Sequence, residues 1–218
     1  MKLKYLFFLS VVLSLVATSC GGGGVKVTPT SMPTATPEPT LTPQPTKQPG
    51  LPDVQLKASD LPEGYKLLTA EEVQSLGLEG IEEKFGASVT GGAPSSSAVF
   101  VNQSQNDFGI IISILSHPLS TKLITSLAAI LSQPKVAEKE LLSGANMKTM
   151  VVKPEYSGLG DGSIGVTATT EEGFMLDAII AYRNSAFMMV IYMYSGVSKV
   201  DLKTVIQKLD DRVKTLPK

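Results

Sequence analysis

The most regular pattern in the chain is residues 163–194, which read SIGVTATT, EEG, FMLDAIIAY, RNS and AFMMVIYMY in turn. The three longer segments, Ser163–Thr170, Phe174–Tyr182 and Ala186–Tyr194, are rich in the β-branched, aromatic and other apolar residues that favour strands. The connections EEG and RNS are short enough to be hairpin turns. The pattern therefore predicts three consecutive antiparallel strands.

A second hairpin is predicted upstream. Ala98–Val101 and Phe108–Leu115 are apolar and strand-forming, and the polar segment Asn102–Asp107 separates them. Consecutive isoleucines at 110, 111 and 112 make both faces of the second strand apolar. This strand is therefore expected to be central and covered on two sides.

Helical patterns lie on either side of these strands. Ala70–Leu76 reads as a short helix closed by Gly77, and apolar residues repeat at helical spacing over Leu123–Leu131. A further helix is predicted from Pro134, where the missing N–H is harmless, to Gly144. Met147–Lys153 is a strand candidate.

The chain closes with an amphipathic helix from Ser198 to about Lys214, for which Ser198 and Asp201 suggest an approximate capping box. One stripe of the helix is apolar and its lysines lie off that stripe. The stripe contains Leu202, Val205, Ile206, Leu209 and Val213. Strands, helices, more strands and a closing helix predict a single α+β domain over residues 53–218, with helices packed on an antiparallel sheet.

The N-terminus has the features of a secretory signal peptide over residues 1–19. Lys2 and Lys4 precede an apolar run from Leu6 to Val16, and small residues lead to Cys20, the single cysteine of the chain. A cysteine in this place resembles the lipobox of bacterial lipoproteins, although Ala17 stands where leucine is commonest. The resemblance implies lipidation of Cys20 and an extracytoplasmic chain tethered to a bacterial membrane, either the cell membrane or the outer membrane.

Residues 20–52 contain the lipidated cysteine and a Gly-, Thr- and Pro-rich segment. Eight of the 14 prolines lie there, in units such as Thr36-Pro37-Glu38-Pro39, and large apolar side chains are scarce. Such a segment is predicted to be a disordered stalk that reaches ~100 Å at full extension. A ligand for a proline-recognising partner and an O-glycosylated segment are the alternatives.

The charge balance excludes one class of partner. Lys2 and Lys4 belong to the leader, which contains no acidic residue, so the remaining chain has 17 basic and 20 acidic residues and a net charge of −3. Nucleic-acid binding usually requires a basic footprint, which this chain lacks.

Two short motifs carry a resemblance to a known group. Leu61-Pro62-Glu63-Gly64-Tyr65 opens the domain, and Leu159-Gly160-Asp161-Gly162 precedes the paired strands and the closing helix. These features resemble small exported lipoproteins of the LpqN and PknH-sensor type, which are similar to the PsbP-like α/β/α sandwich. The resemblance implies a domain that binds ligands or partners without a known reaction.

Residues that could support catalysis or bind a metal are few. His117 is the single histidine and is expected at a strand end, where a solvated side chain is its simplest interpretation. Asp161 and Glu155 could be imagined in a calcium loop, but the regular acidic spacing of such loops is missing. The sequence therefore predicts no catalytic residue, no metal site and no cofactor.

The methionines Met175, Met188, Met189 and Met193 cluster on two neighbouring predicted strands. Alternation places Met189 on the face of Phe187 and Ile191, and Met188 on the opposite face. Methionine fills irregular cores and also lines adaptable apolar binding surfaces. Core filling is the simpler interpretation, and an apolar groove is the functional one.

Two functional hypotheses follow. The first is a membrane-anchored, non-catalytic cell-envelope lipoprotein whose domain binds an unknown ligand or envelope protein. The second is a carrier or chaperone for a lipid or other hydrophobic molecule.

Overall fold

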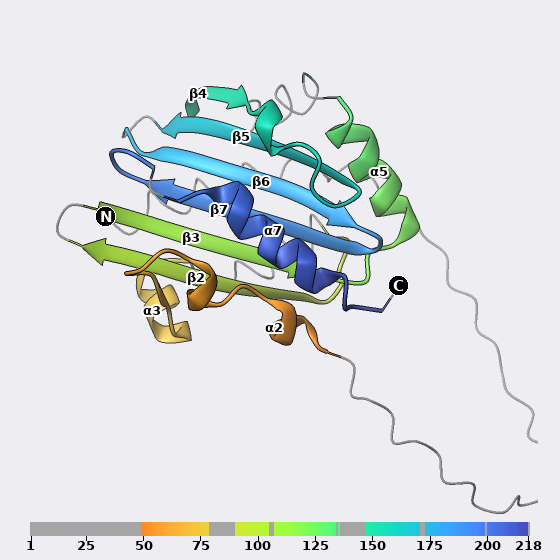
Figure 1. Ribbon diagram of the computed structural model, residues 1–218, viewed down its shortest axis with the longest axis horizontal. Helices are drawn as coiled ribbons and strands as arrows, with labels where there is room; N and C mark the ends of the chain where they lie inside the picture. The colour runs from red at the N-terminus through yellow and green to blue at the C-terminus, as the bar shows by residue number, and fades with distance from the viewer. Residues whose placement is uncertain are drawn as a thin grey trace, which may run out of the picture.

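The computed structural model describes residues 49–78, 90–104, 107–133, 135, 147–170, 173–198 and 200–217. Its centre is a sheet of seven strands in the order β1-β2-β3-β7-β6-β5-β4, with every neighbouring pair antiparallel (Figure 1). The strands are β1 (Lys66–Leu67), β2 (Ser95–Ser104), β3 (Asp107–Ser116), β4 (Met147–Val152), β5 (Gly162–Thr170), β6 (Met175–Arg183) and β7 (Ala186–Tyr194). The predicted α+β class with helices packed on an antiparallel sheet is confirmed.

The predicted hairpins form as expected. β5 pairs with β6 and β6 with β7, so residues 163–194 make one three-stranded antiparallel unit. β3 lies between β2 and β7, and its side chains are buried on both faces. Ile111 packs on one face and Ile110 and Ile112 on the other, which confirms the predicted central strand.

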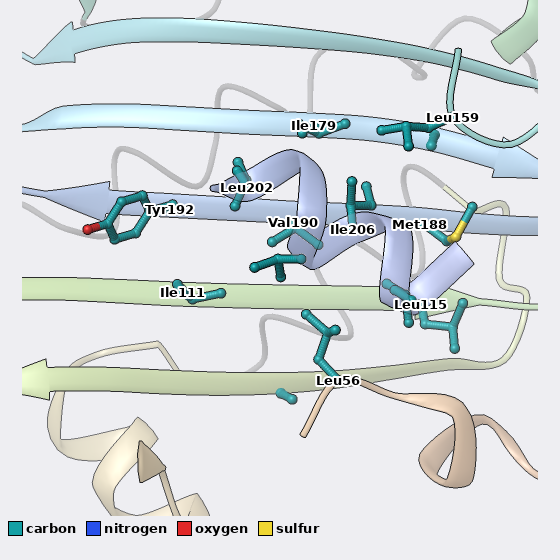
Figure 2. Close-up of a cluster of buried hydrophobic side chains, with 14 of the residues drawn as sticks. Leu56, Ile111, Leu115, Leu159, Ile179, Met188, Val190, Tyr192, Leu202 and Ile206 are labelled. Carbon is teal, nitrogen blue, oxygen red and sulfur yellow. The ribbon is translucent and has the colours of Figure 1, made fainter. Parts of the chain in front are cut away.

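One face of the sheet, here called the α7 face, is covered by α7 (Leu202–Val213). Figure 2 shows Leu202 and Ile206 directed at the strands, close to Val190 of β7. All five apolar residues of the predicted stripe are buried, whereas Lys203, Lys208 and Lys214 are exposed. The short α2 (Leu51–Val54) also packs on this face, with Val54 3% exposed.

The opposite face, here called the α5 face, holds a second apolar cluster. Leu127 of α5 (Thr121–Leu131) is buried in it, and Val73 of α3 (Ala70–Ser75) packs against it. The strands contribute Phe187, Met189 and other residues of β7 and its neighbours. The sheet is therefore the middle layer between two apolar clusters.

The differences from the prediction include two boundaries and one additional strand. β2 extends from Ser95 to Ser104 rather than Ala98–Val101, because every one of its residues pairs with β3 regardless of side-chain polarity. β1 was not predicted, since two residues carry no periodicity. α7 begins at Leu202 rather than Ser198, because the Asp201 carboxylate itself caps the helix by accepting from the N–H groups of Lys203 and Thr204.

Several predictions fall outside the described residues. The leader, Cys20, nearly all of the stalk and the helix from Pro134 to Gly144, apart from residue 135, are among them. α2 begins at Leu51, slightly before the predicted domain boundary at Asp53. None of the helices that the structure describes is long and apolar enough to cross a membrane.

Candidate functional site

The four methionines do not form one common surface. Met188 and Met189 are fully buried, the former in the α7-face cluster and the latter in the α5-face cluster. Met175 and Met193 are half-buried and pack against the α7-face and α5-face clusters, respectively. The faces of Met188 and Met189 agree with the predicted alternation, and all four side chains contribute to the packing of the two sides of the sheet.

His117 follows the last residue of β3 and is half-buried. Its Nε2 lies 2.9 Å from the carbonyl oxygen of Pro217, so the ring donates to the C-terminal tail in the tautomer that carries the proton on Nε2. This contact links the end of the strand to the segment after α7. It gives the side chain a structural role.

Asp161 and Glu155 have separate partners. The N–H of Asn184 donates to Asp161 Oδ2 at 2.6 Å, and Glu155 lies 3.6 Å from the ammonium nitrogen of Lys153. Across the described ranges, no group of three or more His, Cys, Asp or Glu side chains is placed to hold a metal ion. Asp161 instead belongs to a cleft at the end of the sheet.

This cleft, here called the loop cleft, has a volume of about 480 Å³, within the range of small-molecule sites. It lies between the end of α5 and the loop that leads into β5, and Figure 1 shows these two segments side by side at one end of the sheet. Its lining residues are Ala128, Leu131, Ser132, Gly158, Leu159, Gly160, Asp161, Gly162, Ser163 and Tyr182.

The shape of the loop depends on the close approach of Gly160 and Gly162 to Tyr182 of β6. A Cβ at Gly160 would lie 2.2 Å from the Tyr182 carbonyl oxygen, and a Cβ at Gly162 would lie 2.6 Å from the tyrosine ring. Gly160 also has a φ of 59°, which glycine adopts without strain. The N–H of Asp161 donates to the Tyr182 carbonyl at 2.8 Å. The loop is therefore fixed against β6.

Ser163 fastens the other side of the loop. Its hydroxyl donates to the carbonyl of Tyr156 and accepts from the N–H of Leu159, both at 3.0 Å. Leu159 is 2% exposed and anchors the loop in the α7-face cluster, where Figure 2 shows it beside the strands. This half of the cleft is thus a preformed wall.

Arg183 lies near the carboxylates of Asp210 and Asp161 but contacts Asp210 much more closely. Arg183 donates from Nε and Nη2 to the two carboxylate oxygens of Asp210, at 2.5 and 2.7 Å. These hydrogen bonds raise the pKa of Arg183 above its ordinary value. Asp161 is left with a 4.0 Å contact between its Oδ1 and Arg183 Nη1, and its side chain is 45% exposed.

A second polar cluster lies on the α7 face. Asp177 is 6% exposed, and its carboxylate accepts hydrogen bonds from the hydroxyls of Thr167 at 2.5 Å and Tyr194 at 3.2 Å. The ring of Tyr194 stacks on that of Tyr192 at 4.5 Å between centroids, and Tyr65 meets Tyr192 edge-on at 6.5 Å. Strand pairing explains the cluster, since Asp177 lies opposite both Thr167 and Tyr192.

The sequence raises only a calcium loop for Asp161, and it does not predict the contacts of Tyr182, Arg183 and Asp177. The glycines around Asp161 were a local signal for an unusual loop. The polar residues in β6, between apolar neighbours, were the corresponding signal for buried hydrogen bonds.

Comparison with known proteins gives little further information. No protein-family model matches the chain, and no curated protein matches it. Among solved structures, it is similar to an uncharacterised protein from Mycobacterium smegmatis, the Rv0999 ortholog, with 15% identity and a TM-score of 0.30. That match covers 78% of this chain and 84% of the other.

Proposed function

We propose that this chain is a membrane-anchored lipoprotein of the bacterial cell envelope whose domain binds a ligand or a protein partner without catalysing a reaction. The anchor rests on Cys20 at the end of a leader, and the stalk on the Thr-Pro units that follow. The observation that carries the binding role is the loop cleft, since it combines a preformed loop, an apolar wall and a half-exposed carboxylate.

The alternative is a carrier that encloses a lipid or another hydrophobic molecule. Such a carrier needs an apolar cavity beneath a helix or within the sheet layers. Phe100, Phe187, Met188 and Met189 are at most 1% exposed and occupy the two faces of the sheet. This packing favours binding at a cleft over enclosure of a ligand in the core.

Replacement of Cys20 tests the anchor. Cys20→Ala is expected to abolish lipid attachment, because the thiol is the atom to which the lipid is joined. Cells that express either form would be labelled with a palmitate analogue, and incorporation into the protein would be compared. Equal labelling of the two forms would show that the chain is not a lipoprotein.

Native mass spectrometry tests the binding role. The full chain, purified from its own cells in mild detergent, is expected to carry a bound molecule or a co-purifying protein in addition to its anchor. Blocking the cleft with Ser132→Trp is expected to remove that species, whereas Ser126→Trp at an exposed position of the same helix should retain it. Retention in both variants would assign the binding to another surface.

A further inference from the structure

The lining of the loop cleft favours positive charge. Asp161, whose side chain is 45% exposed, is one of its lining residues, and so is Leu131, the last residue of α5. The C-terminal end of a helix carries a partial negative charge, and the last turn of α5 has no basic residue to balance it. None of the described residues that line the cleft is lysine or arginine.

Arg183, which lies close to Asp161, does not neutralise this negative charge. Arg183 is bound through two nitrogens to Asp210, whose side chain is 1% exposed. Its remaining contact with Asp161, at 4.0 Å, is too long for a hydrogen bond. Asp161 Oδ2 accepts from the N–H of Asn184, so Oδ1 is the oxygen that is left for a second cation.

The cleft also has a place for an apolar chain. Ala128 and Leu131 of α5 line one side, and Tyr182 of β6 and residues 158–163 of the loop line the other. Within the part of the chain that the structure describes, the Tyr182 hydroxyl makes no hydrogen bond, so it is available as an acceptor or donor. Apolar lining residues beside a half-exposed carboxylate suit an alkyl chain with a terminal ammonium group, which has three donors.

We propose that the loop cleft binds a primary alkylammonium group, with the ammonium at Asp161 and the alkyl chain between Leu131 and Tyr182. The group could come from a free amine or from a lysine side chain of a protein partner. This inference rests on the proposed binding function and specifies its chemistry. An anionic ligand is disfavoured, because the carboxylate and the helix end would repel it.

The test compares matched probes on the full chain purified in detergent. Binding of n-butylammonium, n-butanol and butyrate would be followed by saturation-transfer NMR in low salt. The ammonium is expected to bind at least about tenfold more tightly than the alcohol, and butyrate should bind most weakly. A second arm compares a blocked Gly-Lys-Gly peptide with its norleucine analogue, and separates a lysine source from a free amine.

Variants assign the contacts. Asp161→Asn is expected to weaken butylammonium binding at least about tenfold, and Tyr182→Phe about two- to tenfold. Glu155→Gln removes an exposed carboxylate outside the cleft and should leave binding unchanged. Should Asp161→Asn fail to fold, Tyr182→Phe decides, because its hydroxyl has no partner in the described chain.

The inference is overturned if butylammonium binds no more tightly than butanol, or if folded Asp161→Asn binds it as well as the unaltered chain. A retained ligand without an amino group, found by native mass spectrometry, would also overturn it while leaving the proposed binding function intact. The palmitate labelling experiment tests the anchor at Cys20, and its result does not bear on the binding of butylammonium.

Discussion

Tyr194 shows what burial beside a carboxylate does to a single side chain. It is 6% exposed, and its hydroxyl donates to Asp177. Burial first, and then the negative charge of Asp177, raise the pKa of Tyr194 to about 12. The folded chain therefore holds this proton more tightly than the unfolded chain, in which tyrosine titrates near pH 10.

The stabilisation linked to Tyr194 is expected to be complete below about pH 10 and to be lost as the pH rises towards 12. The reason is that the unfolded state releases the proton first. Urea unfolding measured between pH 8 and pH 12 would show this decline, and Tyr194→Phe should make it shallower. Some decline should remain in the variant, because burial and Asp177 also raise the pKa of Tyr156. Identical slopes for both proteins would contradict the assignment.

At the scale of elements, α7 is held to the sheet by its apolar stripe. Leu209 is fully buried in the α7-face cluster. Leu209→Ala is expected to lower the free energy of unfolding by ~2–5 kcal/mol, through lost burial and the cavity left behind. Leu67→Ala, at a leucine that is 55% exposed, is the control and should change much less. Equal effects in urea melts would mean that α7 does not pack as described.

A charge pair between Arg212 and Asp60 joins α7 to the start of the domain. Asp60 ends the 3₁₀ helix η2 (Ala58–Asp60), and Arg212 donates to both of its oxygens at 2.7 Å. Burial opposes ionisation of Asp60, but the hydrogen bonds from Arg212 and from the N–H of Lys57 outweigh it and hold the pKa of Asp60 below its ordinary value. The pair fastens two segments that are distant in sequence.

Asp60→Asn is expected to lower the free energy of unfolding at neutral pH by roughly 1.5–3 kcal/mol, the usual contribution of a charge-assisted hydrogen bond. A lowered pKa gives stability that is present above the unfolded pKa, near 3.9, and is lost as the pH falls through the folded pKa. The difference between the two proteins should therefore shrink below about pH 4. Asp211→Asn, in an exposed pair with Lys214, should change the Tm little.

At the scale of the whole molecule, a predicted stalk followed by a folded domain leads us to expect protease cleavage in the stalk and a resistant domain. Brief digestion with proteinase K is expected to cut within residues 21–50 and to leave a fragment that begins near Leu51, where α2 starts. Intact-mass measurement of the fragment identifies its first residue. Recovery of a protected fragment that includes the Thr-Pro units would show that this segment packs on the domain.

Features with a local cause could be predicted from the sequence. Strand composition and three-residue connections lie within residues 163–194, so the β5–β6–β7 unit follows from that segment alone. The apolar stripe on α7 follows from residue spacing within one helix. The position of the first turn could not be predicted in the same way, because Asp201 caps the helix with its own carboxylate. The α+β class was predictable for the same reason.

The candidate site depends on contacts that no local pattern encodes. The loop cleft joins Ser132 at the end of α5 to Asp161 and Tyr182, and the pair Arg183–Asp210 joins β6 to α7. The Asp177 cluster likewise exists because strand pairing brings Thr167 and Tyr192 to opposite sides of one carboxylate. Residue composition and periodicity report which face of an element is apolar. Which polar groups meet across elements is set by the packing of the sheet and helices, and therefore required the tertiary structure.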